Sequence, residues 1–186
     1  GVGLMDCKEA LKQASGDMEK AIDYLREKGL AKLQKRMGKV ASEGLIASYI
    51  HTGSKVGTMV EINCETDFVA NTKDFQEFAR DIAMQITASN PMYVKREDVP
   101  EEAKEKEKNI YRKQALESGK PEKILDKIAE GKMEKFYQEV CLMEQPFIKN
   151  PDVTVKGLLE ELIVKMGEKI LITRFIRYQL GETNQE

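Results

Sequence analysis

The sequence predicts an α+β fold with a three-stranded antiparallel sheet, and three observations support this prediction. Two strand-like segments, 44–50 and 56–64, flank a short loop in a pattern typical of a β-hairpin. Several amphipathic helical segments follow, and a final segment, 169–180, again alternates as a strand does. Strands, then helices, then a strand favour an α+β fold over a doubly wound parallel sheet.

Composition and charge exclude several function classes. The chain has 186 residues, of which 41% are hydrophobic and 33% charged, enough for one or two small folded domains. Its net charge of -2 disfavours nucleic-acid binding by bulk charge. We expect a cytoplasmic protein without a membrane segment, because the sequence contains neither a long apolar run nor a signal-peptide pattern.

The cysteines give no pattern of a disulfide framework or a zinc site. They are odd in number, far apart and never in a C-x-x-C pair: Cys7, Cys64 and Cys141. We expect packing cysteines, with an intermolecular bridge as the alternative.

The first segment predicts two short helices. Four residues share one face of the first helix: Leu4, Cys7, Leu11 and Ala14. Asp17 precedes the second helix, and Gly29 is expected to end it. Because two helices this short cannot enclose a core, a third partner is expected. The basic stretch that follows predicts a linker or a mobile helix, which divides the chain into a helical unit (1–31), a linker (32–41) and a core (42–186).

The core segments after the hairpin predict helices and one strand. Apolar residues at helical spacing run from 75 to 86, and Asn90 follows near the end of that helix. Segment 101–113 is dominated by Glu and Lys, which predicts a solvated helix or one arm of a helical hairpin, and Pro121 suits the first turn of the next helix. Thr154 and Gly167 bound another helix. In the last strand, strict alternation places Ile170, Ile172 and Ile176 on one face and Leu171, Thr173 and Phe175 on the other.

The most distinctive stretch, 61–71, runs from the second strand through an acidic-aromatic turn into a helix. Asp67 and Phe68 stand next to each other at this turn. A large ring beside a carboxylate on a turn suggests contact with another molecule. In the alternative, Thr66 or Asp67 only caps the turn and Phe68 folds back into the core.

Motifs for chemistry are missing from the sequence. The segment Ser118–Pro121 lacks the leading glycine and the hydroxyl of a phosphate-binding loop. His51 is the only histidine, which excludes a histidine-based metal cluster and leaves no nucleophile signature beside it. We therefore expect no enzyme activity, cofactor or metal. Two other classes stay open: an adaptor that binds partners without releasing a nucleotide, and an enzyme with a pocket of shifted ionisable groups.

The stretch 61–71 resembles the signature of bacterial elongation factor Ts, centred on Thr66-Asp67-Phe68-Val69. The opening 1–11 is similar to the first signature of that family, and further segments are similar to landmarks of its core: 118–121, 145–147, 174–177 and 180–182. The resemblance implies a small ubiquitin-associated-like helical domain followed by an α+β core with a Glu/Lys-rich helical hairpin. Two departures are evident, since the first helix of the family has no counterpart before Gly1 and the core is as short as in compact members with one core module.

The resemblance also implies a function without covalent chemistry. Members of the family are guanine-nucleotide exchange factors that bind GDP-loaded elongation factor Tu, disturb its Mg²⁺ and phosphate site, and stabilise the nucleotide-free partner until GTP binds. Such a factor needs no cofactor, only stronger binding to the nucleotide-free partner than to the loaded one. Compact members imply a homodimer.

The resemblance assigns Thr66, Asp67, Phe68 and Val69 to the central contact with the partner, with Phe68 as a wedge beside the partner's magnesium site. Burial of such a ring stabilises by roughly 1.5–3 kcal/mol, enough to change exchange about ten- to a hundredfold.

Further contacts follow from the same resemblance. Leu4 and Met5 match an apolar pair at the edge of the helical domain, where the alternative is ordinary helix core. His51 matches a histidine that meets another partner helix, with an ordinary surface residue as the alternative. Met166, Gly167 and Glu168 match a further contact turn, although Met166 also continues the inward stripe of its helix, which favours core packing.

Overall fold

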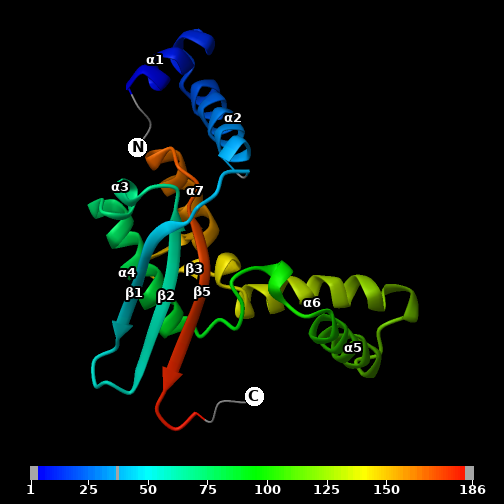
Figure 1. Cartoon of the computed structure of the whole chain (residues 1–186). Helices are drawn as coiled ribbons and strands as arrows, with labels where there is room; N and C mark the ends of the chain where they lie inside the picture. The colour runs from blue at the N-terminus through cyan, green and yellow to red at the C-terminus, as the bar shows by residue number, and fades with distance from the viewer. Residues whose placement is uncertain (1–3, 37, 183–186) are drawn as a thin grey trace.

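The computed structural model describes residues 4–36 and 38–182 and consists of a sheet with helices on one face and a helical hairpin at its side (Figure 1). In chain order the helices and strands are α1 (Leu4–Gln13), α2 (Met18–Arg36), β1 (Glu43–Ile50), β2 (Val56–Cys64), α3 (Asp67–Ala70), α4 (Lys73–Ser89), α5 (Glu101–Glu117), α6 (Leu125–Val140), β3 (Pro146–Phe147), β4 (Asn150–Thr154), α7 (Val155–Met166) and β5 (Leu171–Gln179). Short 3₁₀ turns lie at Arg96–Asp98, Glu122–Ile124 and Leu142–Glu144.

The main sheet has the order β1-β2-β5 with antiparallel neighbours, which confirms the predicted three-stranded sheet. Helix α4 covers one face of the sheet (Figure 1), and its apolar stripe is buried as predicted: Phe75, Phe78, Ala79, Ile82, Ala83 and Ile86. Asn90 ends α4 in the left-handed conformation. Together with Val60 and Ile62 of β2 and Leu159 of α7, this stripe forms the hydrophobic core.

Strand β5 does not alternate strictly, so the prediction that Ile176 shares a face with Ile172 was wrong. Ile172 pairs with Ile62 and Arg174 pairs with Glu61, which leaves Thr173 as an extra residue on β5. This β-bulge reverses the alternation beyond it, because one unpaired residue moves every later side chain to the opposite face. Phe175 therefore packs against the core, and Ile176 is exposed on the open face of the sheet.

Gly44 makes the close pairing of β1 and β2 possible. Its φ of 143° lies in a region that residues with a side chain rarely adopt, and an added Cβ would lie 2.1 Å from the backbone oxygen of Ile62. Glycine is therefore required at the start of the sheet that carries the candidate site.

The N-terminal helices pack on each other, and α2 is longer than expected. The prediction that Gly29 ends the second helix was wrong, because α2 continues to Arg36. Gly29 lies inside α2 against α7, where an added Cβ would meet Val164 Cγ2 at 3.6 Å, so tertiary packing outweighs the low helix propensity of glycine. The helix thus covers the first half of the expected linker, residues 32–36. Residue 37 lies outside the described residues. The division into 1–31, 32–41 and 42–186, and the ubiquitin-associated-like character of the first unit, stay predictions.

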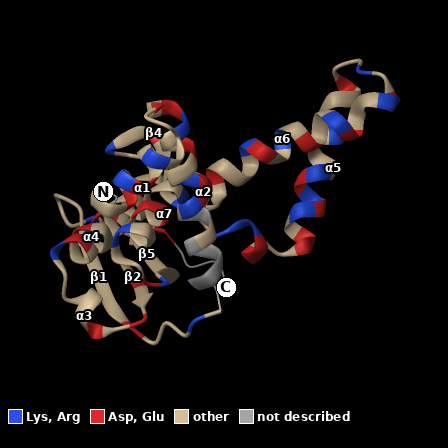
Figure 2. Cartoon of the chain, turned by 90° about the horizontal axis from the view of Figure 1, so that it is seen from above, with Lys and Arg blue, Asp and Glu red and all other residues tan. Residues whose placement is uncertain are grey.

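Helices α5 and α6 form the expected antiparallel hairpin, which projects from the sheet (Figure 1). Figure 2 shows Lys and Arg alternating with Asp and Glu along both helices. Lys132 links them, because its Nζ donates to Gln114 Oε1 at 2.8 Å and lies 5.3 Å from the ring centre of Tyr111. At the base, Arg96 donates to Glu144 and Glu134 and stacks on Tyr137. Charged and cation–π contacts of Arg96 thus hold the base of the hairpin.

Two further features complete the described fold. Strands β3 and β4 form a separate antiparallel pair that the sequence did not predict, and Thr154 at its end caps α7, as expected, by accepting from Gly157 N. None of the helices in residues 4–36 and 38–182 combines the length and apolar character needed to cross a lipid bilayer.

Candidate functional site

The most prominent exposed feature is the turn Thr66–Val69, called the tip below, which follows β2. Thr66 is extended, with φ of −131° and ψ of 151°, and its Oγ1 accepts from Val69 N at 3.4 Å, which caps the single turn of α3. Thr72 then caps α4 by accepting from Phe75 N at 3.3 Å. Two successive caps therefore define the path of the backbone on both sides of the tip.

The side chains of the tip divide between solvent and core. Phe68 is 78% exposed and Asp67 is also exposed, whereas Val69 is 5% exposed and belongs to the core cluster. Phe68 does not fold back into the core, although Thr66 does cap the turn. The tip thus presents a carboxylate and an aromatic ring to solvent while Val69 anchors it.

A second segment of the chain supports the tip from the side. Glu168, which follows the Gly167 cap of α7, accepts from Thr66 N at 3.1 Å and from Thr66 Oγ1 at 2.7 Å. In the opposite direction, Glu65 Oε1 accepts from Lys169 N at 2.7 Å. The resemblance placed Glu168 in a contact turn, but sequence reasoning missed its bonds to Thr66, because nothing local indicates a contact between residues 102 positions apart.

The other predicted site residues lie on separate parts of the molecule. Leu4 and Met5 are 85% and 75% exposed on α1 and take no part in a helix core. His51 is exposed in the loop at the opposite end of β1 and β2 from the tip, with its Nδ1 3.2 Å from the Tyr49 hydroxyl. The structure therefore does not gather these residues and the tip into one cluster.

Met166 and Gly167 lie at the C-terminal end of α7, next to the residue that holds the tip. Met166 packs against the core, which confirms the prediction of core packing for its side chain. Gly167 is exposed and ends α7 with a φ of 70°, so the chain turns sharply before Glu168.

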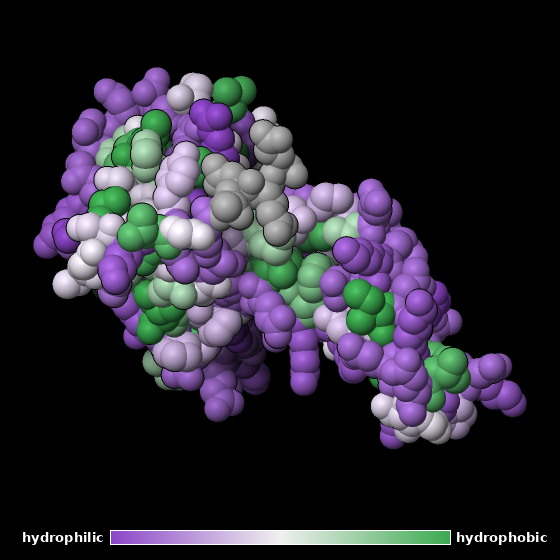
Figure 3. Space-filling model, turned by 90° about the horizontal axis from the view of Figure 1, so that it is seen from below, coloured by the Kyte–Doolittle hydropathy of each residue, from purple (hydrophilic) through white to green (hydrophobic). Residues whose placement is uncertain are grey.

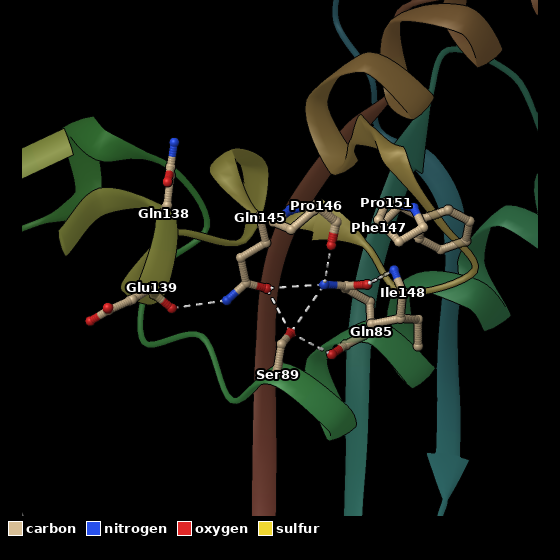
Figure 4. Close-up of a pocket in the computed structure, with 9 residues that line it drawn as sticks. All are labelled: Gln85, Ser89, Gln138, Glu139, Gln145, Pro146, Phe147, Ile148 and Pro151. Atoms are coloured by element: carbon tan, nitrogen blue, oxygen red, sulfur yellow. Dashed lines mark hydrogen bonds between the residues drawn. The ribbon is translucent and has the colours of Figure 1, made fainter. Parts of the chain in front are cut away.

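A hollow of about 400 Å³ lies away from the tip, between α4, α6 and the β3–β4 pair (Figure 4). Three of its polar side chains, those of Gln85, Ser89 and Gln145, bond to one another. Gln85 Nε2 donates to Ser89 Oγ, Gln145 Oε1 and Pro146 O, while Gln85 Oε1 accepts from Ile148 N. Gln145 Nε2 donates to Glu139 O. Because these three side chains satisfy each other, the network ties the base of the hairpin to α4, and none of the three needs a ligand as a partner.

Reactive side chains do not converge on any site in the described part of the chain. Among residues 4–36 and 38–182 there is no group of His, Cys, Asp and Glu with the geometry to hold a metal ion. Cys64 and Cys141 are buried, as expected for packing cysteines, and burial raises the pKa of both thiols, that of Cys141 to about 11. Both side chains are therefore protonated, inert thiols at neutral pH.

Comparison with known proteins assigns the family. The family model described as Elongation factor TS matches residues 6–182. The elongation factor Ts of Carboxydothermus hydrogenoformans is 62% identical over 182 residues, which cover 98% of this chain and 84% of that protein. The elongation factors Ts of Moorella thermoacetica and Syntrophus aciditrophicus are also 62% identical, over 98% of this chain and 90% of each relative. The match covers the capped tip, the sheet and the helical hairpin together, and the chain belongs to the elongation factor Ts family.

Proposed function

We propose that this chain is a guanine-nucleotide exchange factor of translation elongation, without covalent chemistry, whose partner is elongation factor Tu. It binds the GDP-loaded partner, promotes GDP release by disturbing the Mg²⁺ and phosphate site, and stabilises the nucleotide-free partner until GTP binds. Membership of the elongation factor Ts family supports the choice of partner.

The observation that carries the proposal is the exposed Phe68 beside Asp67 on a turn held by the sheet and α7. An exchange factor must bind the nucleotide-free partner more tightly than the loaded one, and GDP must then weaken the factor by the same ratio. A rigid aromatic ring that enters the partner only in its opened form supplies such a difference. Because Mg²⁺ and the phosphates hold each other, a ring that displaces the ligands of the ion loosens GDP.

The remaining predicted contacts extend the interface along the molecule. Leu4 and Met5 offer exposed apolar side chains on α1, and His51 offers an exposed imidazole at the far end of the sheet. Gly167 lies near the tip, because the next residue, Glu168, accepts a hydrogen bond from Thr66 N. We assign Leu4, Met5 and His51 to secondary contacts that contribute to affinity, while the tip acts on the nucleotide site.

We also propose that two copies of the chain associate through the face of the main sheet that α4 does not cover. Exposed apolar side chains from all three strands lie on that face: Ile46, Ile50, Met59, Ile176 and Tyr178. Figure 3, which views the molecule from below, shows apolar side chains in green among hydrophilic ones in purple on that end of the molecule. An uncovered apolar sheet face of this kind is typical of an interaction surface.

Sedimentation of the purified chain tests the dimer. We expect a dimer for the unmodified chain and a monomer for Met59→Glu, because a charge in the middle of an apolar interface has no partner. Met92→Glu is the matched control, since Met92 is also exposed, at 67% against 50% for Met59, but lies after α4 and outside the sheet. A monomeric unmodified chain, or a Met59→Glu variant that still forms dimers, contradicts this part of the proposal.

Stopped-flow release of a fluorescent GDP analogue from purified elongation factor Tu, with excess GDP as chase, tests the exchange function. We expect faster release with substoichiometric amounts of this chain, because a factor that dissociates after each exchange acts repeatedly. Binding without acceleration would instead indicate an adaptor and refute the exchange proposal.

A further inference from the structure

Glu168 stands out because its carboxylate bonds to both polar groups of Thr66 that face it. One oxygen accepts from the backbone N of Thr66 at 3.1 Å, and the other accepts from the hydroxyl at 2.7 Å. Glu168 comes from the turn after α7, and its path is set by the left-handed Gly167. Two bonds from one carboxylate fix both the position of Thr66 and the rotation of its hydroxyl.

The hydroxyl orientation matters because Thr66 also caps α3. A threonine hydroxyl has one proton and two lone pairs, and its rotation is free unless a partner selects it. Because the Thr66 hydroxyl donates its hydrogen bond to Glu168, a lone pair of Thr66 Oγ1 stays available to accept from Val69 N. The carboxylate of Glu168 therefore stabilises the cap without touching Phe68 itself.

A second bond reinforces the same connection between the two segments. Glu65 Oε1 accepts from Lys169 N at 2.7 Å, so each segment accepts a backbone N–H from the other. The thiol of Cys64 donates to Thr66 O at 3.1 Å on the buried side. The backbone that carries Phe68 is thus held on both sides.

Phe68 itself contributes little to the stability of the turn, because its ring is largely in solvent. An exposed turn without other support has to be ordered at the moment of binding, and that ordering reduces the free energy left for the partner. Support from a neighbouring rigid element removes this cost before binding.

We propose that Glu168 is a positioning residue for nucleotide exchange, which holds the tip in its binding conformation through Thr66. The inference rests on the proposed exchange function, because its effect on activity passes through Phe68. It also makes a statement about the chain alone: the amide groups of the tip are protected by Glu168 in the absence of any partner.

The test compares Glu168→Gln with Glu161→Gln in two assays. Gln keeps the shape of the side chain but places an amide nitrogen where Thr66 needs an acceptor, so one bond is lost. Glu161 is the matched control, because it is exposed on α7 and its side chain makes no hydrogen bond or ion pair among the described residues. Its substitution also changes the net charge equally. We expect Glu168→Gln to slow catalysed GDP release about three- to tenfold, the size of one net hydrogen bond. The same loss should lower the melting temperature by only about 2–4 °C, so the variant stays folded in the assay.

Hydrogen exchange measured by NMR on the free chain gives the second readout. We expect the amide protons of Thr66 and Val69 to exchange faster in Glu168→Gln and at the unmodified rate in Glu161→Gln. The GDP release rate of the double variant, in which Glu168→Gln is combined with Phe68→Ala, gives the third readout. If Glu168 acts through the tip, Glu168→Gln slows release no further once the Phe68 ring is absent, whereas a merely structural role or a separate partner contact adds its effect in that background.

Each outcome decides one proposal. Unchanged amide exchange in Glu168→Gln overturns the positioning role, whatever the activity. Full additivity with Phe68→Ala overturns it as well. If the unmodified chain does not accelerate GDP release, the exchange proposal fails, and amide exchange still tests the support of the tip by Glu168. Should Glu168→Gln fold poorly, Thr66→Val and Thr66→Ser replace it: we expect loss of protection and activity with Val, and retention with Ser, which keeps the hydroxyl.

Discussion

Replacement of Phe68 by alanine separates a ring that acts on a partner from a ring that stabilises the fold. In the free chain the side chain is 78% exposed, so its truncation leaves no cavity and we expect a melting temperature close to that of the unmodified chain. Phe75 is the matched control, because the same substitution removes a fully buried ring at the start of α4. Phe75→Ala is expected to lower the free energy of unfolding by about 3–5 kcal/mol.

The expected loss of exchange follows from the area that Phe68 still exposes. Full burial of a phenylalanine side chain stabilises by roughly 1.5–3 kcal/mol, and 78% of the side chain remains available for burial against a partner. Scaling by that fraction gives about 1.2–2.3 kcal/mol, which corresponds to roughly a 7- to 50-fold slower GDP release if the ring is buried mainly in the opened state of the partner.

The assay is the dependence of the GDP release rate on factor concentration, measured with thermal unfolding of the same preparations. We expect Phe68→Ala to lower the maximal rate of GDP release while the fold is retained. Phe75→Ala should instead lower the melting temperature, with any loss of activity following from unfolding. An unchanged release rate in Phe68→Ala, or a loss of activity that parallels unfolding, would refute the wedge role of Phe68.

Three further predictions concern stability and reactivity. Gly44→Ala should lower the free energy of unfolding by about 1–3 kcal/mol, because a Cβ would collide with the backbone of β2; Gly131→Ala, in open space inside α6, should raise it by about 0.5–1 kcal/mol, as thermal denaturation can check. Arg96 holds the pKa of Glu144 below its usual value of 4.5, so this pair stabilises the fold above pH 4.5. Its contribution to the free energy of unfolding is lost as the pH falls through the lowered pKa of the folded state. Unfolding curves of Glu144→Gln, measured at several pH values, should lack that part of the acid dependence. Cys141 should resist a thiol reagent at pH 8 in the folded chain and react after unfolding, and rapid labelling of the folded chain would contradict its burial.

Local patterns in the sequence predicted most of the fold. The hairpin, the stripe of α4, the cap at Thr154 and the end of α7 at Gly167 all follow from periodicity and capping within one element. The exposure of the turn that carries Phe68 was also accessible, because a capped turn with an aromatic residue beside a carboxylate is a local signal.

Features that depend on pairing between distant segments could not be predicted. The bulge at Thr173 results from the register between β5 and β2, which alternation within β5 does not contain. Continuation of α2 through Gly29 depends on packing against α7, which outweighs local propensity. The support of Thr66 by Glu168 joins residues 102 positions apart, and a single sequence gives no sign of it.

The central position of β2 between β1 and β5 affects the order in which the protein can fold during synthesis. Glu61 of β2 pairs with Arg174 of β5 across 113 residues, so the sheet gains its third strand only after nearly the whole described chain has left the ribosome. Until then one edge of β2 is unpaired, and the tip lacks the carboxylate that holds Thr66. The chain therefore acquires a supported tip late, and ribosome-bound fragments that end before α7 should have the signature sequence without the rigid surface that it forms in the complete fold.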